Sequence, residues 1–261
     1  MRYNLLALLL GLTAAPAMAQ DRDFCADRPG QGTPACTIGR GQAMVEVGLF
    51  AWDHVADPAT VENDLTYGDL LLRVGLDDRT ELQLGLGGYT AGRSRDRLSG
   101  AVNRTRGMGD ATIGLRRSLS GPGGPIALQG YITLPTGRSG IGAGDWGAGV
   151  LLPMGYQLPA GFELDLTPEV DAAVNANGSG RHLTWGGVAG LSHAIGPALS
   201  MAGELGTWRD NDPSGHATDM RGAVSLAWQA GKDWQLDLEA DLGLTAAAPR
   251  HSLMLGLARR F

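Results

Sequence analysis

The chain has 261 residues and a formal net charge of −6, with 41 glycines but only four phenylalanines and two cysteines. A single lysine, Lys232, and a mildly acidic balance exclude the nucleic-acid binders that depend on basic charge. Beyond the first residues no long apolar run occurs and the mean hydropathy is −0.06, which excludes transmembrane helices.

The N-terminus has the pattern of a secretory signal peptide. Arg2 supplies a positive charge, Leu5 to Leu12 form a short apolar stretch, and Ala17-Met18-Ala19 is a small-residue cleavage site. The stretch is too short for a spanning helix, which needs about 20 apolar residues. We therefore expect residues 1–19 to be removed after Ala19, leaving an exported chain.

Residues 20–41 contain both cysteines, Cys25 and Cys36, with two prolines and two glycines between them. In an exported chain such a pair predicts a disulfide that closes a small loop. A metal site would need more ligands than two cysteines, and no histidine lies nearby. We expect this segment to lie on the periplasmic side and to staple the chain before its first strand.

From residue 42 to residue 261 apolar and polar residues alternate with a period of two, which is the signature of β-strands. In residues 80–90, for example, Leu82, Leu84 and Leu86 alternate with Glu81 and Gln83. The alternation predicts about twelve strands, an even number, at residues 42–52, 68–77, 80–90, 109–119, 126–134, 146–158, 162–174, 183–193, 199–208, 220–228, 234–244 and 251–261.

The connections between these strands alternate in length. Tight turns are expected at residues 77–79, 121–125, 159–161, 196–197 and 231–233. Longer polar loops are expected near residues 53–66, 91–106, 135–145, 175–181 and 209–218. Short turns on one rim and long loops on the other are typical of outer-membrane barrels.

Large aromatic residues on the apolar face occur at strand ends. A soluble core would instead place its largest residues in the middle of the strands, so two aromatic girdles around a Leu/Val band indicate a surface in contact with a bilayer. The girdle candidates are Tyr156, Phe162, Trp228, Trp234 and Phe261 beside tight turns or the terminus, and Trp146 and Trp185 beside long loops.

The opposite face carries ionised groups in mid-strand, which would be costly to bury in a dry core but can face a hydrated lumen. The lumen-lining candidates are Arg73, Glu81, Asp110, Arg116, Glu163, Asp165, Glu204, Asp237, Glu239 and Asp241. Two alternatives stay open: the charges line a passage that biases which solutes pass, or they pair with one another across a narrow, packed lumen.

The fold class that follows is all-β, a closed antiparallel transmembrane β-barrel over residues 42–261 with both termini periplasmic. Closure is expected because an open sheet edge has no hydrogen-bond partner in hydrocarbon. The last strand ends in Phe261 and resembles the C-terminal recognition strand of bacterial outer-membrane proteins. That resemblance implies outer-membrane lipid and the barrel-assembly machinery as partners.

Several segments resemble the phenol-degradation meta-pathway family of outer-membrane transporters. These segments are Gly109–Leu115, Leu134-Pro135-Thr136-Gly137, the Trp146–Val170 stretch and the cysteine segment Cys25–Cys36. The motifs are strand and turn signatures and contain no catalytic set. The resemblance implies a barrel in the outer membrane that passes small-molecule solutes, aromatic or hydrophobic ones included.

Other constellations give weaker indications of chemistry. Residues 210–215 match the opening of a calcium loop, but the twelfth position is Arg221, where a bidentate Glu is needed. Asp210, Asp212 and His216 could also form a protease site on this loop, but aspartates and a histidine often share a short loop by chance, and an ordinary polar loop is the simpler interpretation. We expect neither a metal nor a cofactor.

A lipid-modifying hydrolase would need a Ser–His pair near the rim. Ser192/His193 and His251/Ser252 are adjacent in sequence, so the two side chains of each pair face opposite sides of their strand. His182 could find a partner on a neighbouring strand, but nothing in the sequence favours one. We expect no catalytic residues and no enzyme. A barrel-embedded hydrolase and a non-transporting structural or surface barrel remain the alternatives to a channel.

Overall fold

In the computed structural model, residues 22–261 are described, and the predicted signal peptide (residues 1–19) lies outside the described residues. The elements are β1 (Ala43–Ala56), β2 (Thr60–Tyr67), β3 (Asp69–Gly75), β4 (Thr80–Leu86), β5 (Tyr89–Asp96), β6 (Val102–Met108), β7 (Ala111–Ser118), β8 (Ala127–Leu134), β9 (Gly147–Leu151), β10 (Met154–Gln157), the short 3-10 helix η2 (Pro159–Gly161), β11 (Phe162–Val174), β12 (Arg181–Ala194), β13 (Leu199–Asp210), β14 (Ala217–Gln229), β15 (Trp234–Gly243) and β16 (His251–Arg260).

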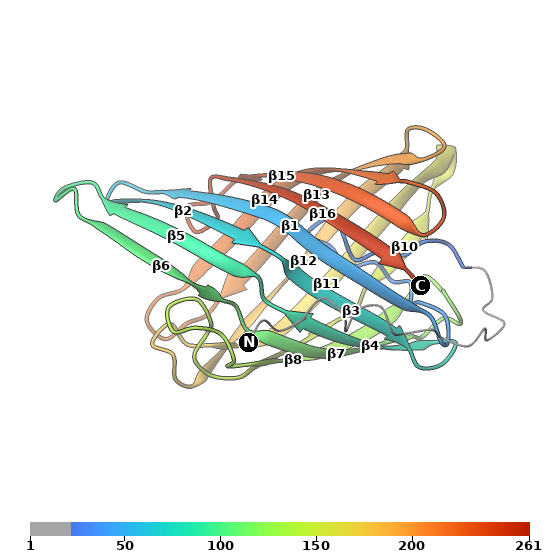
Figure 1. Cartoon of the computed structure of the whole chain (residues 1–261), viewed down its shortest axis with the longest axis horizontal. Helices are drawn as coiled ribbons and strands as arrows, with labels where there is room; N and C mark the ends of the chain where they lie inside the picture. The colour runs from blue at the N-terminus through green and yellow to red at the C-terminus, as the bar shows by residue number, and fades with distance from the viewer. Residues whose placement is uncertain (1–21) are drawn as a thin grey trace, which may run out of the picture.

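These segments form one antiparallel barrel of twelve strands, which confirms the predicted fold class (Figure 1). Four of the strands consist of two segments each: β2–β3, β4–β5, β6–β7 and β9–β10. The barrel closes between β1 and β16, where Ala43 and Phe261 exchange two backbone hydrogen bonds of 3.2 and 2.8 Å. No described helix is long and apolar enough to cross a membrane.

The barrel is polar inside and apolar outside, as alternation on lipid-facing strands requires. The outward side chains of the apolar band each expose 37–57 % of their surface, and examples are Leu84, Ile113, Ile132, Val150, Val170, Leu205, Val224, Leu238 and Leu255. In contrast, the charged Arg73, Glu81 and Arg116 are fully buried. This distribution is the opposite of that in a soluble protein, because here the leucines face outward to lipid tails and do not pack in a protein interior.

The prediction of long loops at residues 53–66 and 91–106 is wrong, because strands occupy most of both ranges. β1 and β2 pair as far as Ala56 and Val61, and β5 and β6 pair from Tyr89 and Met108 to Arg95 and Val102. The resulting extension projects beyond the rest of the barrel at the left of Figure 1. In this extension both faces of the strands are polar enough to contact water. The alternation of apolar and polar residues therefore stops there, although the strands remain hydrogen-bonded to one another.

A β-bulge in β1 also changes one predicted face. The pairing of β1 with β16 shifts between Gly48 and Phe50, so that Leu49 has no direct partner. Beyond this bulge the side chains of odd- and even-numbered residues exchange faces. Ala51 pairs with Met254 on the inner side, and Trp52 pairs with Leu253, which points outward. Strict alternation over the predicted strand 42–52 places Ala51 on the outer face together with Leu49, and this prediction is wrong because the bulge turns Ala51 inward.

Candidate functional site

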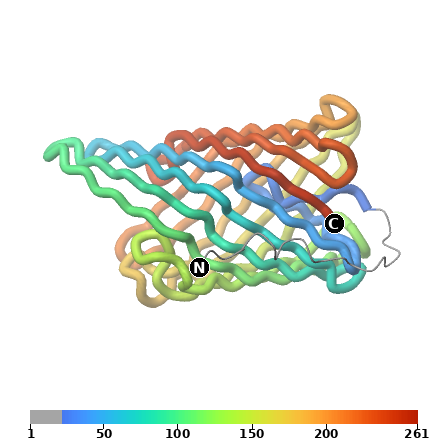
Figure 2. The backbone as a smooth tube through the Cα atoms, in the orientation of Figure 1, coloured from blue at the N-terminus to red at the C-terminus, as the bar shows by residue number. Residues whose placement is uncertain are grey.

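The described part of the N-terminal segment lies inside the barrel near the rim that carries the tight turns. Figure 2 shows this dark-blue segment running within the barrel, and we call residues 22–41 the strap. The disulfide predicted between Cys25 and Cys36 is present, with a Cα–Cα distance of 6.1 Å. The disulfide makes the strap a compact loop whose backbone groups need partners on the barrel wall.

Arg73 of β3 is the centre of the contacts on one side of the barrel. Its Nε and Nη2 donate to the two carboxylate oxygens of Glu81 at 2.8 and 2.9 Å. Its Nη1 donates to the carbonyl oxygen of Cys25 at 2.6 Å and lies 3.1 Å from Glu46 Oε1 and 2.9 Å from Asp27 Oδ1. A fully buried guanidinium is therefore compensated by three carboxylates and a strap carbonyl.

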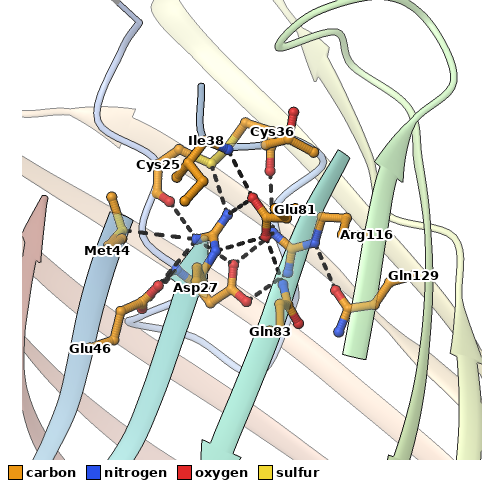
Figure 3. Close-up of polar contacts among 12 residues, drawn as sticks. Cys25, Asp27, Cys36, Ile38, Met44, Glu46, Glu81, Gln83, Arg116 and Gln129 are labelled. Carbon is orange, nitrogen blue, oxygen red and sulfur yellow. Dashed lines mark hydrogen bonds and ion pairs between the residues drawn. A yellow bond between two sulfur atoms is a disulfide. The ribbon is translucent and has the colours of Figure 1, made fainter. Parts of the chain in front are cut away.

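Arg116 of β7 holds the same aspartate from a second strand (Figure 3). Its Nη1 and Nη2 donate to the two oxygens of Asp27 at 2.8 and 2.6 Å, a bidentate pair. Nη1 also donates to the carbonyl of Cys36 at 3.2 Å, and Nε donates to Gln129 Oε1 at 2.7 Å. The two arginines thus bind both ends of the disulfide loop.

Carboxylates on this wall also accept hydrogen bonds from the strap backbone. Glu46 accepts from the amides of Asp27 and Arg28 at 2.9 and 3.1 Å, and Glu81 accepts from the amide of Ile38 at 2.8 Å. We call the β1–β3–β4–β7 side, which carries Glu46, Arg73, Glu81 and Arg116, the arginine wall.

Burial and neighbouring charges shift the pKa of Asp27 in opposite directions. Burial raises the pKa of this carboxyl, but attraction to the guanidinium groups of Arg116 and Arg73 outweighs it. The pKa of Asp27 therefore lies below its ordinary value of 3.8. At neutral pH the strap presents a carboxylate to two arginines, which is the state that these contacts require.

The opposite side of the barrel, β11–β15, holds the strap differently. Glu204 accepts from the amides of Gln31 and Gly32 at 2.7 and 3.2 Å, and Glu239 accepts from the amide of Gly30 at 2.8 Å. Thr167 both accepts from and donates to the backbone of Thr33, at 3.1 and 3.0 Å.

The ion pair on this side is looser than those around Arg73, because Arg28 Nε lies 3.4 Å from Asp237 Oδ1. We call this side, which carries Thr167, Glu204, Asp237 and Glu239, the acidic wall. The strap therefore spans the interior from one wall to the other.

Two cavities lie against opposite sides of the strap. One, of about 290 Å³, is lined by the disulfide, Pro34 and the inward side chains of Glu163, Asp165 and Gln235. The other, of about 260 Å³, is lined by Gln31, Trp208, Arg221, Glu239, Asp241 and Met254. Arg28 and Pro29 border both cavities, so this part of the strap separates them.

The predicted lumen candidates fall into three groups. Arg73, Glu81, Arg116, Glu204, Asp237 and Glu239 contact the strap, as described above. Glu163, Asp165 and Asp241 line the two cavities. Asp110 instead accepts from the amides of Gly137 and Ala143, both at 2.7 Å, and so anchors the loop that follows β8.

Sequence analysis did not select the aromatic side chains of the interior. Tyr131 donates from its hydroxyl to Asp171 at 2.7 Å, and the Trp208 indole donates to Glu169 at 3.3 Å. Both aromatic residues lie on the polar face of their strands. The alternation of the sequence could therefore have indicated that they point into the barrel. They place two ring faces among carboxylates on the long-loop side of the strap.

All seven girdle candidates point outward and expose 37–60 % of their surface: Trp146, Tyr156, Phe162, Trp185, Trp228, Trp234 and Phe261. Two further outward residues, Tyr67 and Tyr89, pair across β2 and β5, and the Tyr67 ring lies 5.8 Å from the Phe50 ring. The sequence interpretation missed them because it placed this region in loops or at the ends of strands.

The alternative catalytic groups do not form a nucleophile–base pair. His193 stacks on Phe162 at 4.5 Å on the outer face, whereas Ser192 borders an interior cavity. Ser252 donates to Asp53 in the interior at 2.5 Å, whereas His251 stacks on His54. Among the described residues, no histidine is hydrogen-bonded to a serine hydroxyl.

His182 and the 210–215 loop hold each other in place. The His182 ring lies 2.8 Å from Asp210 and 3.0 Å from Asn175. Hydrogen bonds from the Ser214 side chain and from the amide of Ala176 lower the pKa of Asp212 to about 2. No group of three or more His, Cys, Asp or Glu within residues 22–261 is arranged to hold a metal ion.

Comparison with solved structures places the fold among outer-membrane barrels. An outer-membrane channel from Pseudomonas putida F1 superposes with a TM-score of 0.66 at 18 % identity, over 90 % of this chain and 99 % of that chain. The β domain of the Bordetella autotransporter BrkA gives 0.54 at 12 % identity, over 83 % and 98 % of the two chains. The translocator domain of NalP from Neisseria meningitidis gives 0.52 at 14 % identity, over 84 % and 87 %.

A search of curated proteins finds no match. The family model described as "Putative MetA-pathway of phenol degradation" matches residues 26–261, which covers the barrel and most of the strap. With its polar interior, lipid-facing leucines and twelve closed strands, the protein is an outer-membrane β-barrel and belongs to this phenol-degradation family.

Proposed function

We propose that this protein is a channel for small solutes, closed at rest by the strap. The observation that carries the proposal is the arrangement of the interior. Cavities of about 290 and 260 Å³ lie on either side of a chain segment that is bonded to both walls. A barrel that only anchored a surface structure would need no chambers in its interior, whereas a conduit needs them in series.

The contacts suit a segment that can leave without unfolding the barrel. The strap is joined to the acidic wall through side chains and its own backbone amides and adds no strand to the sheet. Release therefore costs hydrogen bonds and ion pairs but leaves the twelve-stranded ladder intact. Water that enters the cavities can replace several of these hydrogen bonds.

The chemistry of the interior favours two properties of the solute. Three carboxylates and one arginine line the cavity beside the disulfide, whereas two carboxylates and two arginines line the other cavity. The passage should therefore attract cations more than anions at the cavity beside the disulfide. On the long-loop side, Trp208 and Tyr131 offer ring faces beside Glu169 and Asp171. We propose that small aromatic solutes with hydroxyl groups are accepted there, since a phenolic hydroxyl can donate to these carboxylates while its ring packs on the indole.

The decisive experiment is conductance in planar bilayers of the wild type and of the Asp27→Asn variant. An amide cannot form the bidentate pair with Arg116, so the variant should open more often. We expect low conductance for the wild type, higher conductance for the variant, and a reversal potential in a KCl gradient that shows cation preference. Catechol should block the open current more than toluene or glucose does.

Silence of both proteins would contradict the channel, provided that each is shown to be folded by its heat-modifiable gel mobility. Equal block by all three solutes would contradict the aromatic specificity and leave the channel standing. The two parts of the proposal therefore fail separately.

We further propose that the seven outward aromatic residues contact lipid at the two interfaces, and that the strand ending in Phe261 is recognised by the barrel-assembly machinery. Phe261 exposes 60 % of its surface, and Arg259 lies over its ring at 4.4 Å. Deleting Phe261 should therefore lower the yield of assembled barrel in the outer membrane. Normal assembly after this deletion would contradict the second proposal.

A further inference from the structure

The β5–β6 hairpin carries a group of arginines on its outer face. Four arginines of this hairpin are exposed and occupy strand positions whose side chains point outward: Arg93 and Arg95 of β5, and Arg104 and Arg106 of β6. Arg93 and Arg104 are direct cross-strand partners. Like charges directly opposite each other destabilise a strand pair, so this arrangement calls for an anion between them.

The protein itself does not supply that anion. Among residues 22–261 no carboxylate lies within 4.0 Å of these four guanidinium groups, whereas some arginines elsewhere at the rims are paired with aspartates. Arg181, for example, lies 2.7 Å from Asp145. The carboxylates of the neighbouring strand β2, Glu62 and Asp64, alternate with outward Val61 and Asn63 and so face the interior.

The height of the arginines relative to the aromatic residues indicates their surroundings. Tyr67, Tyr89 and Met108 are cross-strand partners in one outward row, each exposing 42–50 % of its surface. Such a row marks the boundary between hydrocarbon and headgroups. Successive outward residues on a strand are about 7 Å apart, so Arg106 lies one step beyond this row and Arg93 and Arg104 lie two steps beyond it.

The hairpin is on the rim opposite to the tight turns, which is the cell-surface side of an outer-membrane barrel. In the outer leaflet of this membrane the lipid is lipopolysaccharide, whose lipid A carries phosphates at the headgroup level. Arginine is suited to this partner because its planar guanidinium binds phosphate oxygens through two parallel hydrogen bonds.

From these observations we infer that the outward arginines of β5–β6 bind the lipid A phosphates of a lipopolysaccharide molecule in the outer leaflet. The acyl chains of this lipid pack below the Tyr67–Tyr89–Met108 row, and a phosphate lies between Arg93 and Arg104. Bound lipid also covers the outer side of β6, which pairs only with β5 among the described strands.

The test measures binding of bisphosphorylated lipid A to the delipidated full-length barrel in detergent by native mass spectrometry. The variant is Arg93→Gln/Arg104→Gln. The matched control is Arg79→Gln/Lys232→Gln, which removes the same charge from two exposed residues at the opposite rim. Parallel titrations use lipid A stripped of its phosphates, and inorganic phosphate as a competitor.

We expect the variant to bind lipid A about tenfold more weakly than the wild type, and the control to stay within about twofold. Removing the phosphates should weaken wild-type binding by a similar factor, and millimolar inorganic phosphate should not displace the lipid. Equal affinities of variant and control, or indifference of the wild type to the lipid A phosphates, would overturn the inference.

Charged side chains can also guard an exposed strand edge against pairing with another chain. That role predicts a different result, namely that Arg93→Gln/Arg104→Gln forms oligomers while its affinity for lipid A is unchanged. Size-exclusion chromatography with light scattering on the same samples separates the two roles, and this second result would also overturn lipid binding.

Discussion

The two walls that hold the strap do so with different chemistry. On the arginine wall, fully buried Arg73 and Arg116 form ion pairs with Asp27, Glu46 and Glu81. On the acidic wall, Glu204 and Glu239 mainly accept hydrogen bonds from backbone amides. A buried charge that loses its partner is far more costly than an amide that loses one of its acceptors. The arginine wall should therefore fix the strap, and the acidic wall should be the side that lets go.

Removal of Arg73 should have the largest effect. Arg73→Gln leaves the carboxylates of Glu46 and Glu81 buried without their main cation, which should lower the free energy of unfolding by about 3–5 kcal/mol. Urea titration of the folded barrel in detergent measures this quantity, with exposed Arg79→Gln as the control. A loss below about 1 kcal/mol would show that the network is not the main anchor.

The disulfide should come second, because it acts on the strap alone. Replacing both Cys25 and Cys36 by serine opens a loop whose ends are 11 residues apart in sequence, and this should cost about 2–3 kcal/mol. The loss should appear as greater protease sensitivity of residues 22–41 while the barrel keeps its gel mobility. If the barrel itself were destabilised equally, the strap would not be a separable element.

A substitution on the acidic wall should have a smaller effect. Glu204→Gln keeps one carbonyl oxygen for the amides of Gln31 and Gly32 but loses the charge, which should cost about 1–2 kcal/mol. Glu163→Gln on the same side of the barrel is the control, since Glu163 accepts no hydrogen bond from residues 22–41. An effect of Glu204→Gln as large as that of Arg73→Gln would remove the proposed difference between the walls.

The smallest effect is expected for a change of pH, because the strap is released only in acidic solution. Because the pKa of Asp27 is lowered in the folded protein, its stabilisation of the strap is fully present above 3.8 and is lost as the pH falls through the lower folded value. Conductance of the wild type should therefore rise on acidification below about pH 4. The Asp27→Asn variant should lack this component, and identical pH profiles for the two proteins would contradict the assignment.

The two sides of the barrel also differ in how well sequence predicts them. On β15, apolar Leu236 and Leu238 alternate with Asp237 and Glu239, and the strand lies where the alternation indicated. On the β1–β7 side, the hydrogen-bonded ladder continues into residues such as Arg93 and Arg104, which have no apolar neighbours to mark a face. Gly68, with a φ of +70°, joins the segments β2 and β3 of one strand. In the sequence such a glycine looks the same as one in a turn, so the continuation of the strand could not be predicted.

The site was predicted in its composition but not in its contacts. The disulfide followed from the two cysteines, and the inward charges followed from the strand parity. That Gln31 would bind Glu204 could not be foreseen, because 173 residues separate them in sequence. The contact depends on the closed barrel bringing β13 to the strap, and local patterns carry no information about this.

Hydrogen–deuterium exchange of the strap in the wild-type barrel at neutral pH tests the central claim most directly, because it needs no substitution. The amides of Asp27, Gly30, Gln31 and Ile38 donate to carboxylates on both walls. They should exchange at least about 100-fold more slowly than in a free peptide with residues 22–41. Exchange at the rate of the free peptide would show that the strap does not occupy the barrel.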